Sequence, residues 1–552
     1  MSNASTQIKP AKRDGVRSLS ALAVFVAILC ALPMIAVFLA AISGGTQTVQ
    51  HLAQTVLGDY ARTTLALVLL VAFGTFSIGV GAAWLVTMTR FPGVRFFEVA
   101  LVLPLAFPAY VLAYAYTHVL DHPGVVQSSL RAMMDWGPRD YWFPEIRSLG
   151  GAACMLVLVL YPYVYLLARA AFVQQSGSTF LAARALGSSP WVAFFKVSLP
   201  LARPAIAGGV LLTVMETIAD FGTVAYFGVQ TFATGIYTSW FSLFDRVGAA
   251  QLALCLLGFA LLLAMLERLQ RGNARYHDPA RQSREAPIAT LKGWQAAAAI
   301  TLCGLPVLLG AVLPVIVLFS MGLGSEQNLL SARYLGFIQN SAKLATVAAL
   351  VTVGAAISIG FLQRMRGGRM AQSAAYIARL GYAVPGGVIA VGLLVPFAAF
   401  DNALDAWMRD TFDISTGLLI TGSIWLLVIA YMVRFLAAAL GAYEGGQAMV
   451  HVNMDAASRS LGQGPIGTLR RVHLPILTPS LLTALLIVFV DVMKELPATL
   501  IMRPFNFDTL AVQAYQLASD ERLEGAAVPS LVIVAMGLLP VILICRQVGR
   551  RP

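Results

Sequence analysis

The chain has 552 residues, of which 58% are hydrophobic and 12% are charged, and its mean hydropathy is +0.77. A soluble chain carries roughly 25% charged residues, so this composition predicts an integral membrane protein and excludes a large soluble domain. The formal net charge of +12 comes from basic residues scattered through short loops between apolar segments, a pattern that does not indicate nucleic-acid binding.

Apolar segments of about 20 residues, the length that crosses a bilayer, recur along the whole chain. They begin near residues 20, 63, 97, 149, 203 and 248, and again near 295, 341, 380, 416, 479 and 527. The first is too long for a cleaved signal peptide, whose apolar region has ~7–15 residues. The pattern predicts an all-α, polytopic membrane protein with about 12 transmembrane helices in two homologous six-helix halves.

The predicted organisation is a first half over residues 1–270, a basic linker over 271–294 and a second half over 295–552. Placing the N-terminus in the cytoplasm puts about 24 Lys and Arg residues on that side and about eight on the other, as the positive-inside rule favours. Both termini are therefore expected in the cytoplasm. Because each half has an even number of spans, the halves are expected to be parallel repeats about an axis along the membrane normal.

A polar loop is repeated between the apolar segments. Residues 182–204 and 457–479 align without a gap at an offset of 275, and nine of 23 positions are identical. The segments 191–198 and 466–473 are each predicted to form a short helix that ends at Leu-Pro and inserts into a groove on a partner. A repeated polar loop indicates that two copies of one partner dock here. The alternative is a surface elbow without a partner.

These loops resemble the cytoplasmic signature of the permease subunits of ATP-binding-cassette (ABC) importers, which reads E-A-A, three residues, Gly, about nine residues and I-x-L-P. Leu181 and Ala456 stand where the family has glutamate, so the role of that glutamate is not carried over to this chain. The two signature loops span 181–200 and 456–475. The matching residues, together with the shared prolines, are Ala182, Ala183, Gly187, Pro190, Leu199 and Pro200 in the first loop and Ala457, Ser458, Gly462, Pro465, Leu474 and Pro475 in the second.

The whole chain resembles the fused, two-half permeases of ferric-iron importers, most clearly over residues 219–237 and 494–512. The resemblance implies a transporter subunit rather than an enzyme, with two copies of an ABC ATPase docked on the loops and a separate extracytoplasmic solute-binding protein. The chain has no G-x-x-x-x-G-K-[ST] motif, so ATP is expected to be used by the partner subunit, with no cofactor on this chain.

Ferric iron is the substrate that the resemblance favours. Permeases for thiamine, phosphonate, polyamines and sulfate share the signature and remain alternatives. A stand-alone secondary transporter would fit the two parallel halves but would leave the repeated loop unexplained. A membrane enzyme would need a cluster of nucleophile and base or of metal ligands, and the sequence shows neither, so no metal site is predicted.

Two acidic pairs lie within the predicted fifth and eleventh spans, again 275 residues apart: Glu216 with Asp220, and Asp491 with Glu495. Residues i and i+4 share a helix face, so each pair is expected to present two carboxylates to the translocation path. Such a ring would attract a cation and disfavour sulfate or phosphonate. The alternative is that Asp220 and Glu495 lie at helix ends and make structural hydrogen bonds.

Overall fold

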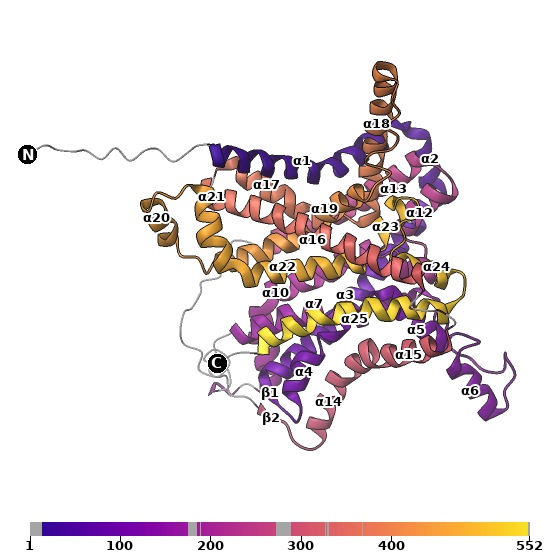
Figure 1. Ribbon diagram of the computed structural model, residues 1–552. Coiled ribbons are helices and arrows are strands. Elements are labelled where there is room, and N and C mark those ends of the chain that lie inside the picture. The colour runs from indigo at the N-terminus through magenta and orange to yellow at the C-terminus, as the bar shows by residue number, and fades with distance from the viewer. Residues whose placement is uncertain are drawn as a thin grey trace, which may run out of the picture. The chain divides into compact units, whose positions relative to one another are not determined.

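The structure is a computed structural model that describes residues 14–174, 185–187, 189–271, 289–325, 327, 331–366 and 368–549 (Figure 1). Within these ranges the regular secondary structure is helical apart from one parallel pairing of two-residue strands, β1 (Thr89–Arg90) and β2 (Ala289–Thr290). The predicted all-α class is confirmed.

Ten of the described helices are long and apolar enough to cross a membrane, and a broken helix pair would bring the number to 11. The pair, Val94–Ala106 and Ala109–Met134, is bent by 92° where the sequence predicted a third span beginning near residue 97. The twelfth predicted position holds α25 (Leu523–Gly549), which is apolar over Leu523–Leu538. The ten long helices are Leu19–Ser43, Leu57–Met88, Leu149–Val173, Phe194–Ala219, Arg246–Leu266, Trp294–Gly324, Ala332–Met365, Gly386–Phe412, Ile424–Gln447 and Pro465–Met493.

The chain forms two compact units. Unit 1 comprises Met1–Ala36, Ser341–Met493 and Met502–Asn506, and unit 2 comprises Val37–Asn340, Lys494–Ile501 and Phe507–Pro552. These units do not follow the two predicted sequence halves. The first helix, α1 (Asp14–Ser43), begins in unit 1, whereas α14 (Trp294–Val307), from the start of the predicted second half, lies in unit 2.

Three long helices form the core of unit 2: α3 (Leu57–Met88), α7 (Leu149–Gln174) and α10 (Leu199–Ala219). Glycines let their backbones approach closely. A Cβ on Gly79 of α3 would lie 2.9 Å from the backbone nitrogen of Tyr165, and one on Gly209 of α10 would lie 2.9 Å from the Cα of Val164. Small residues at such contacts give the van der Waals packing that holds helices together in lipid.

The other elements of unit 2 are α2 (Gly45–Thr55), α4 (Val94–Ala100), η1 (Leu103–Ala106), α5 (Ala109–Leu120), α6 (Val125–Met134), α9 (Pro190–Ala193), η2 (Phe194–Ser198), α11 (Gly222–Tyr226), α12 (Phe232–Tyr237), η3 (Thr238–Ser242), α13 (Arg246–Arg271), η4 (Leu308–Val312), α15 (Leu313–Gly324), α24 (Leu510–Ser519) and α25 (Leu523–Gly549). Helix α23 (Pro497–Met502) lies in this unit up to Ile501. Helix α25 packs on α15 and α24.

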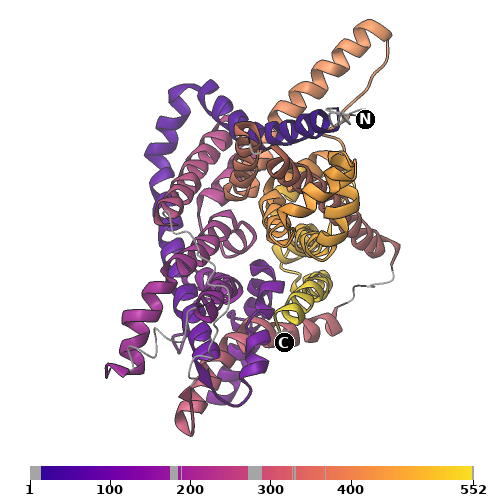
Figure 2. The ribbon, with the colours of Figure 1, turned by 90° about the vertical axis from the view of Figure 1, so that its left-hand side faces the viewer.

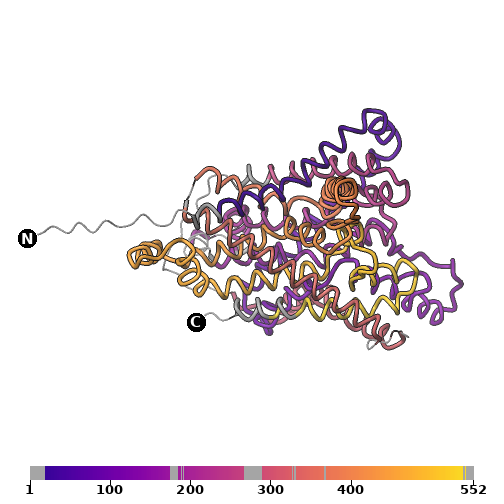
Figure 3. Tube along the Cα trace, turned by 45° about the horizontal axis from the view of Figure 1, so that its top comes forward, coloured from indigo at the N-terminus to yellow at the C-terminus, as the bar shows by residue number. Residues whose placement is uncertain are grey.

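In unit 1, α19 packs on α22, and Figure 2 shows these orange helices nearly end-on. Helix α18 crosses them steeply in Figure 1 and is the orange-brown helix seen end-on in Figure 3. A Cβ on Gly392 of α18 would collide with the backbone of Pro33, so the start of α1 packs directly on α18. The elements of this unit are α16 (Ala332–Arg366, from Ser341), α17 (Arg369–Leu380), η5 (Gly381–Ala383), α18 (Gly386–Phe412), α19 (Ile424–Gln447), α20 (Val452–Ser460), α21 (Pro465–Thr468), η6 (Leu469–His473) and α22 (Leu474–Met493).

The sequence duplication reappears in local structure. The series α9, η2, α10 begins at residues 190, 194 and 199, and the series α21, η6, α22 begins at 465, 469 and 474, each 275 residues later. A second series, in which a short helix and a 3-10 turn lead to a helix after proline, occurs as α4, η1, α5 and again as α17, η5, α18.

Candidate functional site

The second repeated loop, residues 456–475, turns sharply at Gly462. The N–H of Gln463 donates to the carbonyl of Ser458 at 3.1 Å, and the N–H of Gly462 donates to the carbonyl of Arg459 at 3.0 Å. This pair of bonds is the Schellman motif, which ends a helix with a residue in the left-handed region. The φ of Gly462 is +76°, and that of Gly187 in the first repeated loop is +86°. Both signature glycines are therefore required by backbone conformation.

The tips of both loops are open. A Cβ added to Gly187 or Gly462 would meet no atom within 4 Å. The residues just before these glycines, Leu186 and Leu461, are 87% and 79% exposed. A large apolar side chain held out at the same place in both copies of the loop suits contact with a partner.

A π-helical turn lies in the last part of each repeated loop, at Phe194–Ser198 and Leu469–His473, after one turn of α-helix. The sequence predicted here a short helix that ends at Leu-Pro. The N–H of Leu199 donates to the carbonyl of Phe194, and the N–H of Leu474 donates to that of Leu469, five residues back in each case. The helix continues through Leu-Pro into α10 or α22, so the predicted helix end is wrong. Proline lacks an N–H and its ring clashes with the carbonyl four residues back in an α-helix, and the wider π turn just before it accommodates both.

The remaining predicted loop residues differ in burial. Ser458 is 4% exposed, and its Oγ lies 2.9 Å from the Oγ1 of Thr468, which links α20 to α21. Ala457 and Pro475 are exposed, and Leu199, Pro200, Pro465 and Leu474 are half-buried. Pro190 begins α9, and Ala182 and Ala183 lie outside the described residues.

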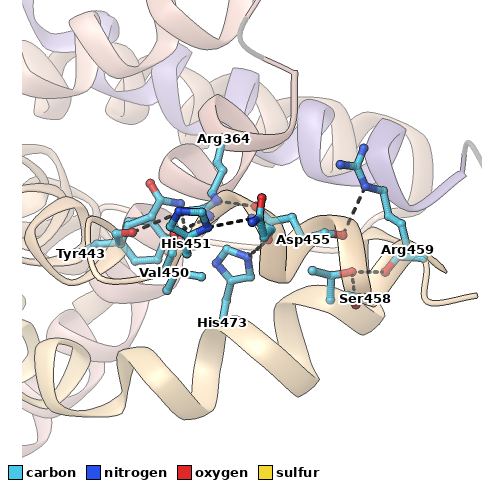
Figure 4. A network of polar contacts seen from close by, with 12 residues as sticks. Arg364, Tyr443, Val450, His451, Asp455, Ser458, Arg459 and His473 are labelled. Atoms are coloured by element: carbon cyan, nitrogen blue, oxygen red, sulfur yellow. Dashed lines mark hydrogen bonds and ion pairs between the residues drawn. The ribbon is translucent and has the colours of Figure 1, made fainter. Parts of the chain in front are cut away.

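A buried charge cluster attaches α20 to its neighbours (Figure 4). The Nε of Arg364 donates to Oδ2 of Asp455 at 2.7 Å, and Oδ1 of Asp455 lies 2.7 Å from Nε2 of His473. The two terminal nitrogens of Arg364 donate to the carbonyls of Gln447 at 3.2 Å and Val450 at 2.7 Å. One guanidinium thus holds the end of α16 to the end of α19 and to α20.

Asp455 is 7% exposed and His473 is fully buried. Burial by itself raises the pKa of Asp455, but the hydrogen bonds from His473 and Arg364 outweigh burial and hold the pKa of this carboxyl below its ordinary value. Asp455 is therefore ionised at neutral pH. The His473 ring packs edge-on against Phe361, with 5.1 Å between ring centroids.

No predicted site residue belongs to this cluster. Ala456 stands where the signature has glutamate, and the carboxylate one residue earlier, at Asp455, was not among the predicted loop residues. The adjacency of an aspartate to the vacant glutamate position was the available signal. The pairing of Asp455 with Arg364 joins residues 91 apart in the chain, and no local pattern marks it.

The acidic pairs are not on continuous helix faces. Helix α10 ends at Ala219 and α22 ends at Met493, so Asp220 and Glu495 lie just beyond the helices that carry Glu216 and Asp491. The expectation that each pair shares one helix face is wrong for this reason. Their place on the translocation path stays a prediction.

Asp220 and Glu495 make matching hydrogen bonds. Asp220 accepts from the N–H of Thr223 at 3.1 Å, the N–H of Val224 at 3.2 Å and the hydroxyl of Thr223 at 3.0 Å. Glu495 accepts from the N–H of Ala498 at 2.9 Å, the N–H of Thr499 at 3.1 Å and the hydroxyl of Thr499 at 2.7 Å. Each carboxylate thus satisfies the free N–H groups at the start of the next short helix.

Within unit 2 the two capping carboxylates share a neighbour, Tyr110 of α5. Both are close enough for their charges to act on its phenol, whose hydroxyl donates to the carbonyl of Lys494 at 3.3 Å. A Cβ on Gly222 would lie 2.9 Å from both Tyr110 and Leu496, so this region is tightly packed. A cavity of about 330 Å³ lies nearby, lined by Phe221, Tyr237 and Tyr515 among others. No group of three or more His, Cys, Asp or Glu side chains is placed to hold a metal ion in the described ranges.

Comparison with known proteins defines the class. Residues 75–275 match the family described as binding-protein-dependent transport system inner membrane component, and the match includes the first repeated loop. This match places residues 75–275 in that family, whose members are permease subunits of ABC importers. Such permeases are not enzymes and carry no cofactor, because ATP is used by the ATPase partner.

The chain is also similar to individual permeases. The chain is 26% identical over 535 residues to the Fe(3+)-transport system permease protein FbpB 2 of Haemophilus influenzae, covering 95% of this chain and 97% of that protein. It is 24% identical to the ferric transport system permease protein FbpB of Actinobacillus pleuropneumoniae, over 79% of this chain and 63% of that one. It is 28% identical to the molybdenum transport system permease protein ModB of Escherichia coli, over 39% of this chain and 90% of that protein. The last match relates less than half of this chain to almost all of a shorter permease, as a fused, duplicated permease would.

Proposed function

We propose that the chain is the permease of a ferric-iron importer. The substrate assignment rests on the similarity to FbpB 2 of Haemophilus influenzae along 95% of this chain. The docking function is supported by the two repeated loops, each with a left-handed glycine, an exposed leucine and a π turn at matching positions.

The proposed topology puts both termini and both repeated loops in the cytoplasm of a bacterial cell. Each loop then binds one copy of an ABC ATPase, and an extracytoplasmic solute-binding protein delivers the substrate to the opposite side. The distribution of basic residues supports this orientation. The duplication supports two ATPase copies, because each half supplies its own loop.

The proposed path runs past Glu216, Asp220, Asp491 and Glu495. Carboxylates at membrane depth are costly and mark ion pathways more often than lipid-facing surfaces. The hydrogen bonds of Asp220 and Glu495 occupy three of the roughly four lone-pair positions that a carboxylate offers. We assign these two a role through their charge and through the helices they cap, rather than as ligands that surround the ion.

The test is uptake by proteoliposomes that hold this chain and its ATPase, with the binding protein added outside. ATP-dependent accumulation of radiolabelled ferric iron is expected, and an ATPase variant that cannot hydrolyse ATP serves as the control. Uptake of thiamine, a phosphonate or molybdate in place of iron would overturn the substrate assignment and leave the class intact. Failure of the ATPase to associate with the chain would overturn the docking function.

A further inference from the structure

The two repeated loops are anchored by different chemistry. In the second half, Arg364, Asp455 and His473 form the buried charge cluster. In the first half, ring packing holds the π turn: Phe194 lies 4.4 Å from Trp84 of α3, and Trp84 lies 5.8 Å from Phe172 of α7, measured between ring centroids. Helices α3 and α7 stand 275 residues before α16 and α19, so corresponding elements provide the two anchors.

The duplication does not conserve either anchor. At an offset of 275, the positions of Arg364, Asp455 and His473 hold the uncharged residues Thr89, Phe180 and Ser198. In the same way, the positions of Trp84, Phe172 and Phe194 hold the non-aromatic residues Ile359, Gln447 and Leu469. The charge cluster therefore belongs to the second half alone, and the aromatic cluster to the first half alone.

The two anchors constrain their loops differently. Apolar packing is non-directional and tolerates small shifts. Charge-assisted hydrogen bonds require donors and acceptors in fixed directions. Arg364 and His473 approach opposite oxygens of Asp455 from α16 and η6, so this one ionised side chain joins α20 to both elements. A buried ion pair that loses one partner is strongly destabilised, because the other charge remains uncompensated.

We propose that Asp455, Arg364 and His473 are positioning residues for ATPase docking at the second repeated loop only, so that the two docking sites on this permease are not equivalent. The inference rests on the proposed docking function of both loops. It predicts that loss of the charge at Asp455 disables one docking site and leaves the other in use.

The test places a photo-crosslinking amino acid at Leu186 or at Leu461 of the full chain and measures crosslinking to the ATPase in membranes. These two positions are the exposed tips of the first and second loops. Asp455→Asn keeps the size of the side chain and removes its charge. It is expected to lower crosslinking at Leu461 about tenfold or more, with less than about a twofold change at Leu186.

The matched control is Glu444→Gln. Glu444 pairs with Arg379 between α19 and α17 in the same unit, at 2.6 Å, and the side chains of Arg379 and Glu444 are 53% and 32% exposed. Surface pairs of this kind contribute little, so neither crosslink is expected to change. Asp455→Glu is expected to restore part of the crosslink at Leu461, because it returns the charge. Trp84→Leu is expected to lower crosslinking at Leu186 and to leave crosslinking at Leu461 unchanged.

If Asp455→Asn does not reach the membrane, the same crosslinking measurement is made on Arg364→Lys. Lysine keeps the positive charge but cannot donate in the three directions that Arg364 uses. Equal loss at both loops, or no loss at Leu461, would overturn the proposal. Absence of both crosslinks in the unaltered protein would instead refute the docking function itself, so the two failures are distinguishable.

Discussion

Gly462 and Gly464 are two residues apart in the second repeated loop, yet their backbones have different requirements. The φ of Gly462 is +76°, whereas that of Gly464 is −75°. A Cβ on either would meet no atom within 4 Å. Alanine at these two positions therefore tests the effect of backbone strain alone, because a Cβ collides with nothing at either position and only Gly462 has a positive φ.

We expect Gly462→Ala to weaken ATPase association by about fivefold to thirtyfold, because an L-residue in the left-handed region costs roughly 1–2 kcal/mol. Gly464→Ala introduces no such strain and is expected to leave association unchanged. The measurement is ATPase retained on the purified permease at graded ATPase concentrations. Equal affinities for the two variants would show that the left-handed turn is not needed for docking.

At Asp220, charge and capping can be separated because asparagine caps a helix about as well as aspartate, whereas alanine does not. Asp220→Asn is expected to lower ferric-iron uptake several-fold while ATPase association persists, because the charge on the path is lost. Asp220→Ala is expected to lower uptake at least as much and to cost about 0.5–2 kcal/mol of local stability. Uptake assays on both variants decide the point: full activity of Asp220→Asn would make this carboxylate a structural cap only.

At the scale of elements, the π turns and the charged side chains in the connecting segments determine the path from one helix to the next. Each π turn brings a proline into a continuous helix at the end of a repeated loop. At the other end of α7, Arg147 joins three connections. It donates to Asp121 at 3.0 Å and to both carboxylate oxygens of Glu521 at 2.7 and 2.9 Å, and it stacks on the ring of Tyr226 at 5.1 Å.

This cluster should make stability depend on pH. The hydrogen bond from Arg147 holds the pKa of Glu521 below its ordinary value of about 4.3. A carboxyl with a lowered pKa stabilises the fold above its ordinary pKa, and this contribution is lost as pH falls through the folded-state value. Because Glu521 is 62% exposed, solvent screening limits the effect to about 1 kcal/mol or less.

We therefore expect Glu521→Gln to lower the midpoint of thermal unfolding at pH 7 and to have little effect at an acidic pH below the lowered pKa of Glu521, where the native carboxyl is protonated as well. The measurement is the midpoint of the purified protein in detergent at both pH values. Glu524→Gln, close by at the start of α25, is the control. An equal loss at both pH values would show that the side chain acts by packing rather than by charge.

At the scale of the molecule, the compact units exchange helices between the predicted sequence halves. Residues up to Ala36 of α1 belong with residues 341–493, and α14 and α15 belong with unit 2. The backbone of Pro33 in α1 lies directly against Gly392 of α18, so a helix from the first half of the sequence packs on one from the second half in unit 1. Neither half of the sequence therefore contains a complete unit.

We expect residues 1–280 and 281–552, expressed as two separate chains in the same cell, to assemble and to co-purify. Each fragment alone should be degraded, because the apolar surface that the missing helices cover is left open. Affinity purification through a tag on one fragment measures the assembly. Gly392→Leu in the second fragment should reduce it, since a side chain there displaces the backbone of Pro33, whereas Gly354→Leu, with open space around its Cα, should not. Independent stability of both fragments would refute the exchange.

The sequence by itself determined the membrane class, the positions of the apolar helices, the duplication and the glycines of the two repeated loops. These are local properties: bilayer thickness sets a length of apolar chain, and a single residue type tolerates positive φ. The resemblance carried by the loop motif led to the correct class of transporter for the same reason, because the motif is contiguous.

Tertiary structure alone decided where α10 and α22 end, and so made Asp220 and Glu495 helix caps instead of members of a helix face. It also decided that Asp455 meets Arg364, 91 residues away, and His473, 18 residues away, and that α1 begins in one unit and ends in the other. The physical reason is that a buried charge needs a partner and an apolar helix needs a surface to pack on. The identity of either partner depends on which distant segments the folded chain brings together.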